Sequence, residues 1–460
     1  MKILITGATG FVGKKLVNEL FLLGHSLTVV TRNAKRAKRS IDLPLKYLEW
    51  SGGKEAIRFP EEAYDGVINL AGENIGKRPW TKSFRKKLRK SRVDYGQNLC
   101  AELAKLPPVR FVLSASAIGI YQTDKNVTHD ENGPEASGFL ADLVRDWEAV
   151  WRKNGTAKRL AFMRLGIVLG RREGVLGRLQ PIFNWGIGGR VGKGDQPMSW
   201  IHCDDLVRIF VTATSDEKYS GVINCVAPGP VTNASFTREL AKALNRPAVI
   251  PVPEKPLRLV LGDMATLVTE GQRVVPAKLN ELGFQFVYDT VSRALDHLVG
   301  PKAIGPAGEL MNCQCFEATQ YLAKPLGEVF EFFSDPYNLE KITPPLLSFK
   351  IESLSSKKVE KGTCIAYRLK IRGVPARWLT LIAEWEKDSH FVDLQLRGPY
   401  KIWHHTHRFI KAPGGTMMYD RVFYQVPLGA LGQQLVGAFI RRDVGKIFSF
   451  RRENLADLLE

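Results

Sequence analysis

The feature that most constrains this chain is a glycine loop near its start. Gly7, Gly10 and Gly13 follow the apolar run Ile3–Thr6 directly and precede an amphipathic stretch, Val12–Leu23. In such a strand–loop–helix unit the first glycine permits a tight turn, the second lets the backbone approach a pyrophosphate, and the third lets helix and strand pack closely. The first amides of the helix would then face the phosphates. The spacing therefore predicts a βα unit that binds a dinucleotide.

The alternation of strand-like and helix-like patterns continues from Lys2 to about Ala213. Such alternation predicts an α/β Rossmann fold, a doubly wound parallel sheet with right-handed crossovers. The expected strands are Ile3–Thr6, Leu27–Thr31, Gly66–Leu70, Phe111–Ser114, Leu160–Leu165 and Gly221–Val226, and the expected helices are Val12–Leu23, Ser83–Lys105, Phe139–Lys153, Asp204–Thr214 and Ser235–Leu244. The segment 249–299 is rich in Pro, Leu and Arg, and we expect a helical cap that completes a first domain, residues 1–301.

The pattern changes after a Gly/Pro-containing stretch, residues 302–311, which is typical of a linker. Residues 312–460 then show alternating apolar and polar runs and two helical stretches. This pattern predicts an α+β domain in which an antiparallel sheet wraps around a C-terminal helix. The expected strands are Gln314–Leu322, Phe349–Ser353, Thr363–Lys370, Trp378–Lys387, His390–Leu396, His404–Lys411 and Thr416–Gln425, and the expected helices are Leu326–Phe333 and Leu431–Leu459.

The end of the second strand indicates which dinucleotide the loop would take. NAD binders place a carboxylate there for the ribose 2′-hydroxyl. Here Thr31 and Arg32 are followed by Lys35 and Arg36, and no acid is present in this stretch. A guanidinium can pair with a 2′-phosphate, so we expect NADP(H), with Arg32 as the phosphate partner. The alternative is that these basic side chains only face water on an exposed loop.

The charge and cysteine content limit the other functional classes. The formal charge is +19, and the densest basic stretch is Lys82 to Arg92. Phe84, Leu88 and Leu99 fall on one helix face, so a solvated basic face is favoured over a nucleic-acid surface. Cys313-x-Cys315 has no second Cys/His pair beside it, which favours a packing role over a metal or redox site. No apolar run approaches the roughly 18 residues of a membrane span, and no leader pattern precedes the first strand, so we expect a soluble cytoplasmic protein.

Further motifs follow the glycine loop in a fixed order. They are Asn69-Leu70-Ala71-Gly72-Glu73-Asn74, Ser91-Arg92-Val93, Ser114-Ala115-Ser116-Ala117 leading to Tyr121, Met163-Arg164-Leu165-Gly166, Trp200-Ile201-His202-Cys203-Asp204-Asp205-Leu206, and Gly271-Gln272-Arg273-Val274 with Pro276. Together they resemble the atypical, epimerase-like branch of the extended short-chain dehydrogenase/reductases over about residues 1–299. The resemblance implies a cofactor site formed by Gly7, Thr9, Gly10, Phe11, Val12, Gly13, Thr31, Arg32, Leu70, Ala71, Gly72, Arg92 and Val168. Arg92 could be a second phosphate cation, or simply a surface ion pair.

The proton relay of typical short-chain dehydrogenase/reductases is missing from this chain, a departure that the branch it resembles shares. Typical members use a Tyr and a Lys four residues later on one helix, with a Ser that polarises the substrate oxygen. In the helix Phe139–Lys153 neither plausible register contains that pair. Tyr121 and Lys125 have the spacing but fall in a loop, so we interpret that match as coincidence. Ser116 and Tyr121 are nonetheless the best catalytic candidates, although Ser116 could equally be a satisfied hydroxyl at a strand end.

The substrate motif also departs from the resemblance. Sugar-nucleotide enzymes of this class commonly place an Arg shortly before the W-I-H-x-D-D motif, whereas Met198 and Ser199 precede Trp200 here. Arg190 or Lys193 could substitute for it. We expect His202 to organise its loop rather than to act as an acid or base.

Residues 312–460 resemble the START/SRPBCC helix-grip domains through Phe330-Glu331-Phe332-Phe333-Ser334-Asp335-Pro336-Tyr337-Asn338. The resemblance implies a cavity for an apolar ligand between sheet and helix. His404, His405 and His407 are clustered, with His405 and His407 on one strand face. Metal binding would require a third ligand and nearby carboxylates, so we expect no metal and favour a cavity-lining role, in which Asp420 and Arg421 could pair across the strands.

Three functional hypotheses follow from these patterns. The first is an atypical NADP(H)-dependent oxidoreductase or epimerase with an appended domain for an apolar small molecule. The second is a non-catalytic NADP(H)-binding sensor, because the Tyr/Lys pair is missing. The third is a nucleotide-sugar epimerase with a rebuilt proton relay. The sequence pattern does not indicate the substrate or the oligomeric state.

Overall fold

The computed structural model describes residues 1–61, 63–154, 157–304, 310–427 and 429–459. The chain divides into two compact units, Met1–Val299 and Gly300–Glu460, and this division lies next to the predicted end of the first domain. Residues 305–309 of the predicted linker lie outside the described residues. On either side of them β15 (Lys302–Ile304) and β16 (Leu310–Asn312) pair as antiparallel strands. No helix in the described ranges has the length and apolar character needed to cross a membrane.

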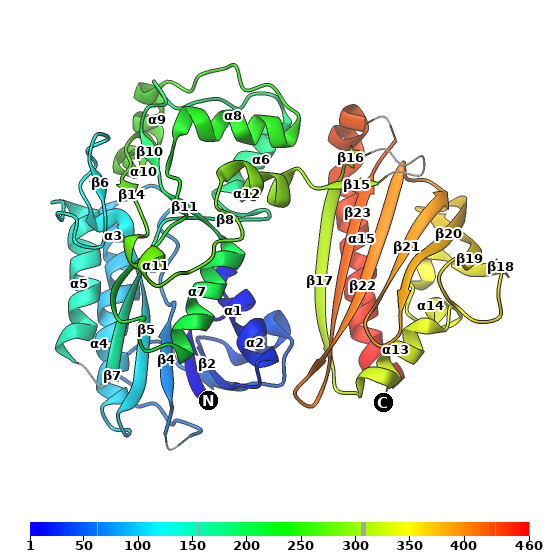
Figure 1. The fold of residues 1–460 in the computed structure, drawn as a ribbon, viewed down its shortest axis with the longest axis horizontal. Helices are drawn as coiled ribbons and strands as arrows, with labels where there is room; N and C mark the ends of the chain where they lie inside the picture. Colours follow the sequence, from blue (N-terminus) through cyan, green and yellow to red (C-terminus); the bar gives the residue numbers. More distant parts are fainter. Residues whose placement is uncertain (62, 155–156, 305–309, 428, 460) are drawn as a thin grey trace. The chain divides into compact units, whose positions relative to one another are not determined.

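The first unit is built on a seven-stranded parallel sheet (Figure 1). Its strand order is β12-β7-β5-β4-β1-β2-β3. The strands are β1 (Lys2–Thr6), β2 (Ser26–Thr31), β3 (Lys46–Glu49), β4 (Gly66–Asn69), β5 (Val109–Ala117), β7 (Ala157–Leu165) and β12 (Gly221–Cys225). This is the predicted Rossmann arrangement, in which the chain direction across the sheet reverses between β1 and β4. Ligands of such sheets bind at the carboxyl ends of the strands beside that reversal.

Helices cover both faces of this sheet because its strands are apolar on both sides. α1 (Phe11–Leu22) packs against α7 (Cys203–Ser215), and α4 (Tyr95–Leu103) packs against α5 (Phe139–Lys153) (Figure 1). The prediction of one continuous helix over Ser83–Lys105 is wrong, because the segment is interrupted. It consists of α3 (Lys82–Arg89), a π-helical turn η1 (Lys90–Asp94) and α4. Its basic face is solvated as predicted, since Lys82, Lys86 and Lys87 are exposed. Arg85 and Arg89 pair with Asp263 and Asp146.

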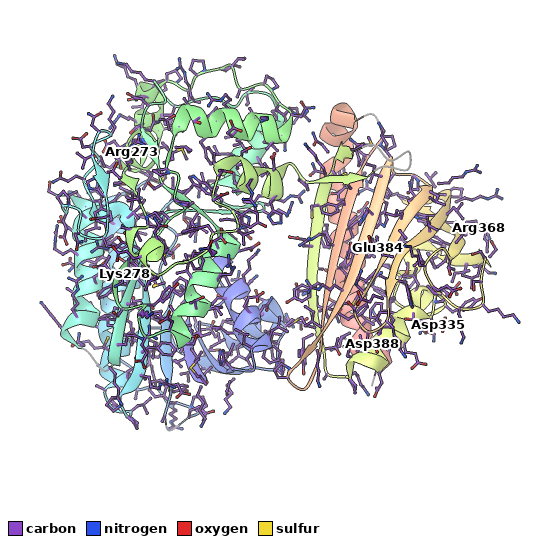
Figure 2. All side chains as sticks on the ribbon, viewed as in Figure 1. Arg273, Lys278, Asp335, Arg368, Glu384 and Asp388 are labelled. Atoms are coloured by element: carbon purple, nitrogen blue, oxygen red, sulfur yellow. The ribbon has the colours of Figure 1, made fainter. Side chains whose placement is uncertain are left out.

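The remaining elements of the first unit extend this core. They are α2 (Ala34–Ile41), η2 (Ile118–Ile120), β6 (Thr128–His129), β8 (Ile167–Gly170), β9 (Glu173–Gly174), α6 (Leu176–Asn184), β10 (Pro197–Met198), β11 (Trp200–His202), β13 (Val231–Thr232) and α8 (Asn233–Leu244). The predicted cap is helical: it contains α9 (Glu254–Leu261), η3 (Gly262–Ala265), α10 (Thr266–Thr269), β14 (Arg273–Val274), α11 (Ala277–Glu281) and α12 (Val291–Val299). Arg273 and Lys278, labelled in Figure 2, mark where it meets the body, because β14 pairs with β6 and the Lys278 ammonium donates to the Ser220 carbonyl.

The second unit contains a seven-stranded antiparallel sheet of order β17-β23-β22-β21-β20-β19-β18. The strands are β17 (Gln314–Leu322), β18 (Lys350–Leu354), β19 (Cys364–Ile371), β20 (Val374–Glu386), β21 (His390–Arg397), β22 (Ile402–Ala412) and β23 (Gly415–Gln425). The helices are α13 (Leu326–Ser334), α14 (Asn338–Lys341), η4 (Pro345–Leu347) and α15 (Gly429–Leu459). The long α15 lies along the sheet (Figure 1), and Val444 and Phe448 pack on Val422 and Tyr424.

A cavity of about 700 Å³ lies within this second unit. Leu369, Trp378 and Ile382 line it from the sheet, Leu339 from α14, and Ile447 from α15. Its wall is therefore mainly apolar. The antiparallel sheet and the C-terminal helix agree with the pattern expected from the sequence.

Candidate functional site

The glycine loop has the geometry that a phosphate requires. Gly7 has a φ of +72°, and a Cβ there would lie 2.4 Å from the Leu70 carbonyl oxygen. A Cβ on Gly13 would lie 2.4 Å from the Gly7 carbonyl oxygen. Gly10 is the N-cap of α1, so the helix starts without a side-chain cap and its first amides keep their hydrogen-bonding capacity. The predicted residues Thr9, Phe11 and Val12 form the rest of this turn.

Buried polar groups join the carboxyl ends of the three central strands. The Thr6 hydroxyl donates to Asn69 Oδ1 at 2.7 Å, and the Asn69 amide donates to the Ser114 hydroxyl at 3.1 Å. Asn69 Oδ1 also accepts from the Ala71 amide. These contacts fix the turn Leu70–Gly72 directly beside the glycine loop. The predicted site residues from β1 and β4 are therefore brought together.

Arg92 lies against that turn, in the π-helical segment between α3 and α4. Its guanidinium donates to the Glu73 carbonyl at 3.0 Å and lies over the Trp147 ring at 5.1 Å. A Cβ on Gly72 would lie 3.1 Å from the guanidinium carbon. Burial lowers the pKa of Arg92 to about 10. The Arg92 guanidinium therefore holds a backbone turn at the edge of the sheet.

The end of β2 presents the predicted basic group to solvent. Arg32 is exposed beyond Thr31, and the Asn33 side chain caps α2 by accepting from the Arg36 amide at 2.7 Å. The structure also places a carboxylate beside the end of β2, which the sequence spacing did not indicate. Glu49 lies opposite Thr31 on β3, and its carboxylate accepts from the Ala34 amide at 2.8 Å.

Val168 is placed near the glycine loop through β8. This strand pairs with β11, with Val168 opposite Ile201. A Cβ on Gly170 would lie 2.0 Å from the Phe11 ring, so that ring packs directly on β8. Phe11 and β8 therefore lie side by side, which brings Val168 near the glycine loop.

Ser116 lies at the end of β5, within a buried charged network. Its hydroxyl donates to Glu148 Oε1 at 2.6 Å. The Arg164 guanidinium donates to both oxygens of the same carboxylate, at 2.9 and 3.0 Å. Burial disfavours the Arg164 charge, but the Glu148 carboxylate raises the pKa of Arg164 above its ordinary value. Arg164 therefore remains a cation inside the domain.

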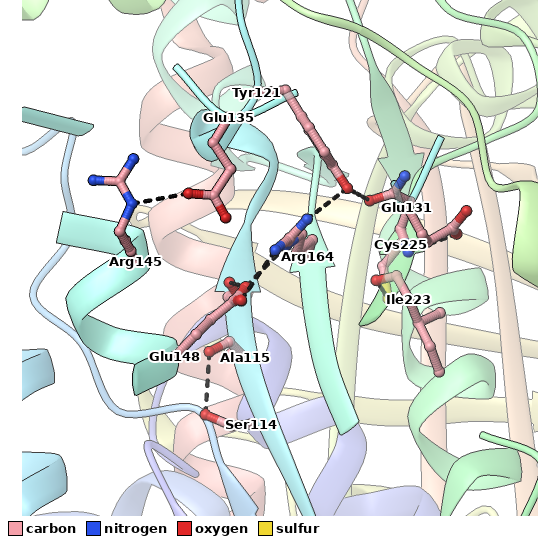
Figure 3. Close-up of polar contacts among 12 residues, drawn as sticks. Ser114, Ala115, Tyr121, Glu131, Glu135, Arg145, Glu148, Arg164, Ile223 and Cys225 are labelled. Carbon is pink, nitrogen blue, oxygen red and sulfur yellow. Dashed lines mark hydrogen bonds and ion pairs between the residues drawn. The ribbon is translucent and has the colours of Figure 1, made fainter. Parts of the chain in front are cut away.

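The same network includes Tyr121, whose side chain is fully buried (Figure 3). The Tyr121 hydroxyl accepts from Arg164 at 2.8 Å and donates to Asn224 Oδ1 at 2.8 Å. Burial raises the pKa of Tyr121, an effect that Arg164 only partly offsets. Lys125, at the spacing of a catalytic lysine, instead pairs with Asp195 at 2.6 Å. The Tyr121–Lys125 spacing is therefore a coincidence, as expected.

Glu148 is the principal residue of this region that the sequence analysis missed. It lies on α5, the helix on which the resemblance places the Tyr and Lys pair. Val144, Glu148 and Trp151 have i, i+4, i+7 spacing and are all buried. A carboxylate in the middle of an apolar helix face is a signal of a buried partner, and here that partner is Arg164 from the Met163-Arg164-Leu165-Gly166 motif.

His202 caps a helix. Its Nδ1 accepts from the Asp204 amide at 3.0 Å at the start of α7, and its ring stacks on Tyr288 with centroids 3.6 Å apart. Burial lowers the pKa of His202 to about 3. This agrees with the expected organising role. Arg190 lines a cavity of about 230 Å³ together with Arg238.

Two of the three clustered histidines face the cavity of the second unit. His405 and His407 line it together with Asp393, whereas Asp420 does not. Burial alone would raise the pKa values of Asp393 and Asp420, but the two imidazoles hold both below the ordinary range. Asp420 therefore pairs with the histidines across the strands, as proposed, while Arg421 pairs elsewhere, with Glu317.

Comparisons with known proteins agree with this description. A model of the NAD dependent epimerase/dehydratase family matches residues 3–225, and a model of a domain of unknown function, DUF1731, matches residues 252–298. The epimerase family protein SDR39U1 homolog, chloroplastic, of Arabidopsis thaliana is 38% identical over 306 residues. These cover 64% of this chain and 86% of that protein.

Solved structures match the same region. The crystal structure of human epimerase family protein SDR39U1 (isoform 2) with NADPH has 32% identity and a TM-score of 0.59, covering 65% of this chain and 99% of that one. The nucleoside-diphosphate sugar epimerase of Corynebacterium glutamicum has 31% identity and a TM-score of 0.51, covering 65% of this chain and 58% of that one. By its strand order, its glycine loop and its identity to the Arabidopsis and human proteins, of which it covers 86% and 99%, this chain belongs to the NAD dependent epimerase/dehydratase family.

Proposed function

We propose that residues 1–299 bind NADP(H) and act as an atypical oxidoreductase or epimerase on a small molecule. The observation that carries this proposal is the helix α1, which begins at Gly10 without a side-chain cap, beside a glycine turn that no Cβ could occupy. The amides of such a helix end favour a pyrophosphate. A relative that this chain spans almost completely was crystallised with NADPH.

The preference for the 2′-phosphate depends on Arg32. We expect Arg32→Asp to weaken NADPH binding about 100-fold, because a charge-assisted pair is replaced by repulsion. NADH binding should change far less, because it has no phosphate at that position. Arg39→Asp is the matched control, since it makes the same charge change in the last turn of α2. Fluorescence titration with both nucleotides measures the two dissociation constants, and an equal loss for NADPH and NADH would refute the role of Arg32.

Ser116 and Tyr121 are the proposed catalytic residues of the first unit. Both lie beside the carboxyl edge of the sheet, where the nicotinamide of a bound cofactor would supply hydride chemistry. Stereospecific oxidation of NADPH in the presence of a library of carbonyl compounds tests this proposal. Ser116→Ala and Tyr121→Phe should then lower kcat by at least about tenfold, the contribution expected of a positioned proton donor.

A second candidate function is an NADP(H)-binding sensor that performs no turnover. The closed environment of Tyr121 favours it: the hydroxyl has two partners inside the domain, and burial raises its pKa, whereas a proton relay needs a lowered one. Inertness toward the library, together with tight NADPH binding, would select this candidate. Tight binding of UDP-sugars would instead favour nucleotide-sugar chemistry, with Arg190 and Arg238 beside their cavity as the phosphate partners.

For the second unit we propose a START/SRPBCC-like domain that binds an apolar small molecule. The cavity of about 700 Å³ and its apolar wall support this, because both are typical of ligand sites. Ile382→Trp should fill the cavity and prevent binding of a fluorescent apolar probe. Val374→Trp, on the same strand but exposed and outside the cavity lining, is the control. Equal probe binding by both variants would refute the cavity as the site.

A further inference from the structure

Two neighbouring strands bring three metal-binding side chains to one point of the cavity wall in the second unit. His405 and His407 lie two residues apart on β22, so their rings share a face of the sheet. Asp393 lies directly opposite His405 on β21. All three residues line the cavity. The carboxylate and third ligand that the sequence spacing could not supply are therefore present.

The distances match those between ligands of a single ion. The carboxylate oxygen Oδ2 of Asp393 lies 3.3 Å from His405 Nδ1 and 3.3 Å from His407 Nε2. In a tetrahedral zinc site the ligand atoms lie about 2.0–2.2 Å from the ion, so neighbouring ligands are about 3.3 Å apart. The Asp393 oxygen has that spacing to each of the two nitrogens. The ligand atoms of the three side chains all lie within 4.8 Å of one another.

Asp420 occupies the position of an outer partner. It lies opposite His407 on β23, and its Oδ1 is 2.9 Å from His405 Nε2 and 2.8 Å from His407 Nδ1. These are the ring nitrogens that face away from Asp393. Histidines that ligate metals usually direct their second nitrogen to a carboxylate, which fixes the ring and strengthens the ligand. Asp420 is not part of the cavity wall, so it supports the rings from behind.

Some polar atoms of this cluster lack partners, which is unusual for a buried group. His407 Nδ1 and two nitrogens of Arg451, Nε and Nη1, have no hydrogen-bond partner among the described residues. The 2.8 Å approach of His407 Nδ1 to Asp420 does not have the direction of a hydrogen bond. Only about 6% of Arg451 is exposed, and its Nη1 lies 3.7 Å from Asp420 Oδ1. His407 Nδ1 and the Arg451 nitrogens lie on the Asp420 side of the two rings, away from Asp393, so they belong to the surroundings of the cluster and are not ligands of an ion.

We propose that Asp393, His405 and His407 bind one divalent transition-metal ion in the wall of the cavity. Two imidazoles favour zinc, cobalt or iron over magnesium or calcium, which prefer oxygen ligands. Three protein ligands leave at least one coordination position open, and it faces the cavity, where an oxygen or nitrogen atom of a bound small molecule would occupy it. This proposal is independent of nucleotide binding by the first unit.

A second cluster with the same residue types lies in the first unit but has its nitrogens engaged. His202 Nδ1 accepts from the Asp204 amide, and His202 Nε2 lies 3.1 Å from His297 Nδ1. Lys15 pairs with the Asp204 carboxylate at 2.5 Å. His202 therefore has no lone pair for an ion. This makes it a matched control.

The test uses the full chain, purified without a polyhistidine tag, stripped with a chelator and titrated with Co²⁺. We expect one Co²⁺ per chain, with visible ligand-field bands of a four- or five-coordinate site. His405→Gln, His407→Gln and Asp393→Asn should each weaken binding at least about 100-fold, and Asp420→Asn should weaken it about tenfold while keeping the bands. His404→Gln and His202→Asn should leave the affinity unchanged.

Two results would overturn the proposal. One is a wild-type chain that binds no Co²⁺, and the other is undiminished binding by the three ligand variants. If a ligand variant fails to fold, the proton NMR spectrum of the wild-type chain with bound Co²⁺ tests the proposal instead. It should contain two strongly shifted imidazole N–H signals that disappear in D₂O and remain in His202→Asn, and their absence would equally overturn the proposal.

Discussion

The two units each contain a buried charged cluster, and the clusters differ in how completely the protein satisfies them. In the first unit, Ser116 and Arg164 donate to the Glu148 carboxylate, and Arg164 also donates to the Tyr121 hydroxyl. In the second unit, the cluster of His407, Arg451 and their neighbours borders a cavity and retains nitrogens without hydrogen-bond partners among the described residues. A satisfied network stabilises the fold, whereas an unsatisfied one beside a cavity is suited to a ligand. The following predictions test this difference.

The largest effect is expected for Glu148→Ala. This change leaves the Arg164 guanidinium buried without its carboxylate, which should cost about 3–5 kcal/mol of unfolding free energy. Arg152, which also pairs with Glu148, is half exposed, so Arg152→Ala should cost less than about 1 kcal/mol. Urea unfolding followed by circular dichroism measures both. A loss for Glu148→Ala no larger than that for Arg152→Ala would show that the first network is not a stabilising one.

The next effect concerns pH and His202. An unfolded imidazole has a pKa of about 6.5, and burial lowers the pKa of folded His202 to about 3. Below pH 6.5 the unfolded state binds the additional proton, so stability is fully present above 6.5 and declines as the pH falls toward 3. At pH 5 this group should reduce the unfolding free energy by about 2 kcal/mol. His202→Asn, which keeps a helix cap, should remove this part of the pH dependence. An unchanged pH profile in the variant would contradict the assignment.

A pair of tyrosines compares the two units directly. Tyr121 and Tyr424 are both fully buried, but the Tyr121 hydroxyl has two partners, whereas the Tyr424 hydroxyl has none among the described residues. Tyr121→Phe should cost about 1–3 kcal/mol, because Arg164 and Asn224 each lose a hydrogen bond. Tyr424→Phe should be nearly neutral. Thermal unfolding of both variants measures this difference. Equal losses of stability would show that the two tyrosine hydroxyls do not differ in their hydrogen bonding.

The smallest effect is expected for Arg451→Met. The guanidinium lies over the Phe448 ring at 5.1 Å, and Met preserves most of the apolar contact of its stem. Because two of its nitrogens have no hydrogen-bond partner in the described structure, the change should alter the unfolding free energy by less than about 1 kcal/mol. Arg164→Met should cost several times more. Urea unfolding compares the two, and a large loss for Arg451→Met would mean that the second cluster is as fully satisfied as the first.

The parts of the fold that depend on local pattern could be predicted from the sequence. Gly7, Gly10 and Gly13 specify their loop through spacing alone, and the alternation of apolar runs specifies the parallel sheet. The helix α2 and the strand β3 were not predicted, because Ala34–Ile41 is mostly basic and Lys46–Glu49 is short and half exposed. β3 is placed by pairing with β2, and α2 is placed by packing on β3.

The polar clusters could be predicted only in part, because they depend on contacts between distant residues. Ser116 and Tyr121 were identified by motif. The partner of Ser116, Glu148, was missed because it lies on α5, where the sequence analysis looked only for a Tyr and Lys pair. His405 and His407 were noted as neighbours on one strand. Asp393 joins them only through the register between β21 and β22, and sequence spacing does not define that register.

The π-helical turn at Lys90–Asp94 has a consequence for how this chain can change by insertion or deletion. Each residue of a regular α-helix turns the chain by about 100°. A π-helical turn holds about one residue more than an α-helical turn. Removing one residue here would therefore close it into a regular turn, and Phe84, Leu88, Leu99 and Leu103 would stay in the core in which all four are buried. Arg92, which lies in the π-helical turn, would move from its position against Gly72. A single-residue deletion in this turn should therefore keep the fold and disturb the edge of the sheet, whereas a deletion within α3 or α4 should be rejected.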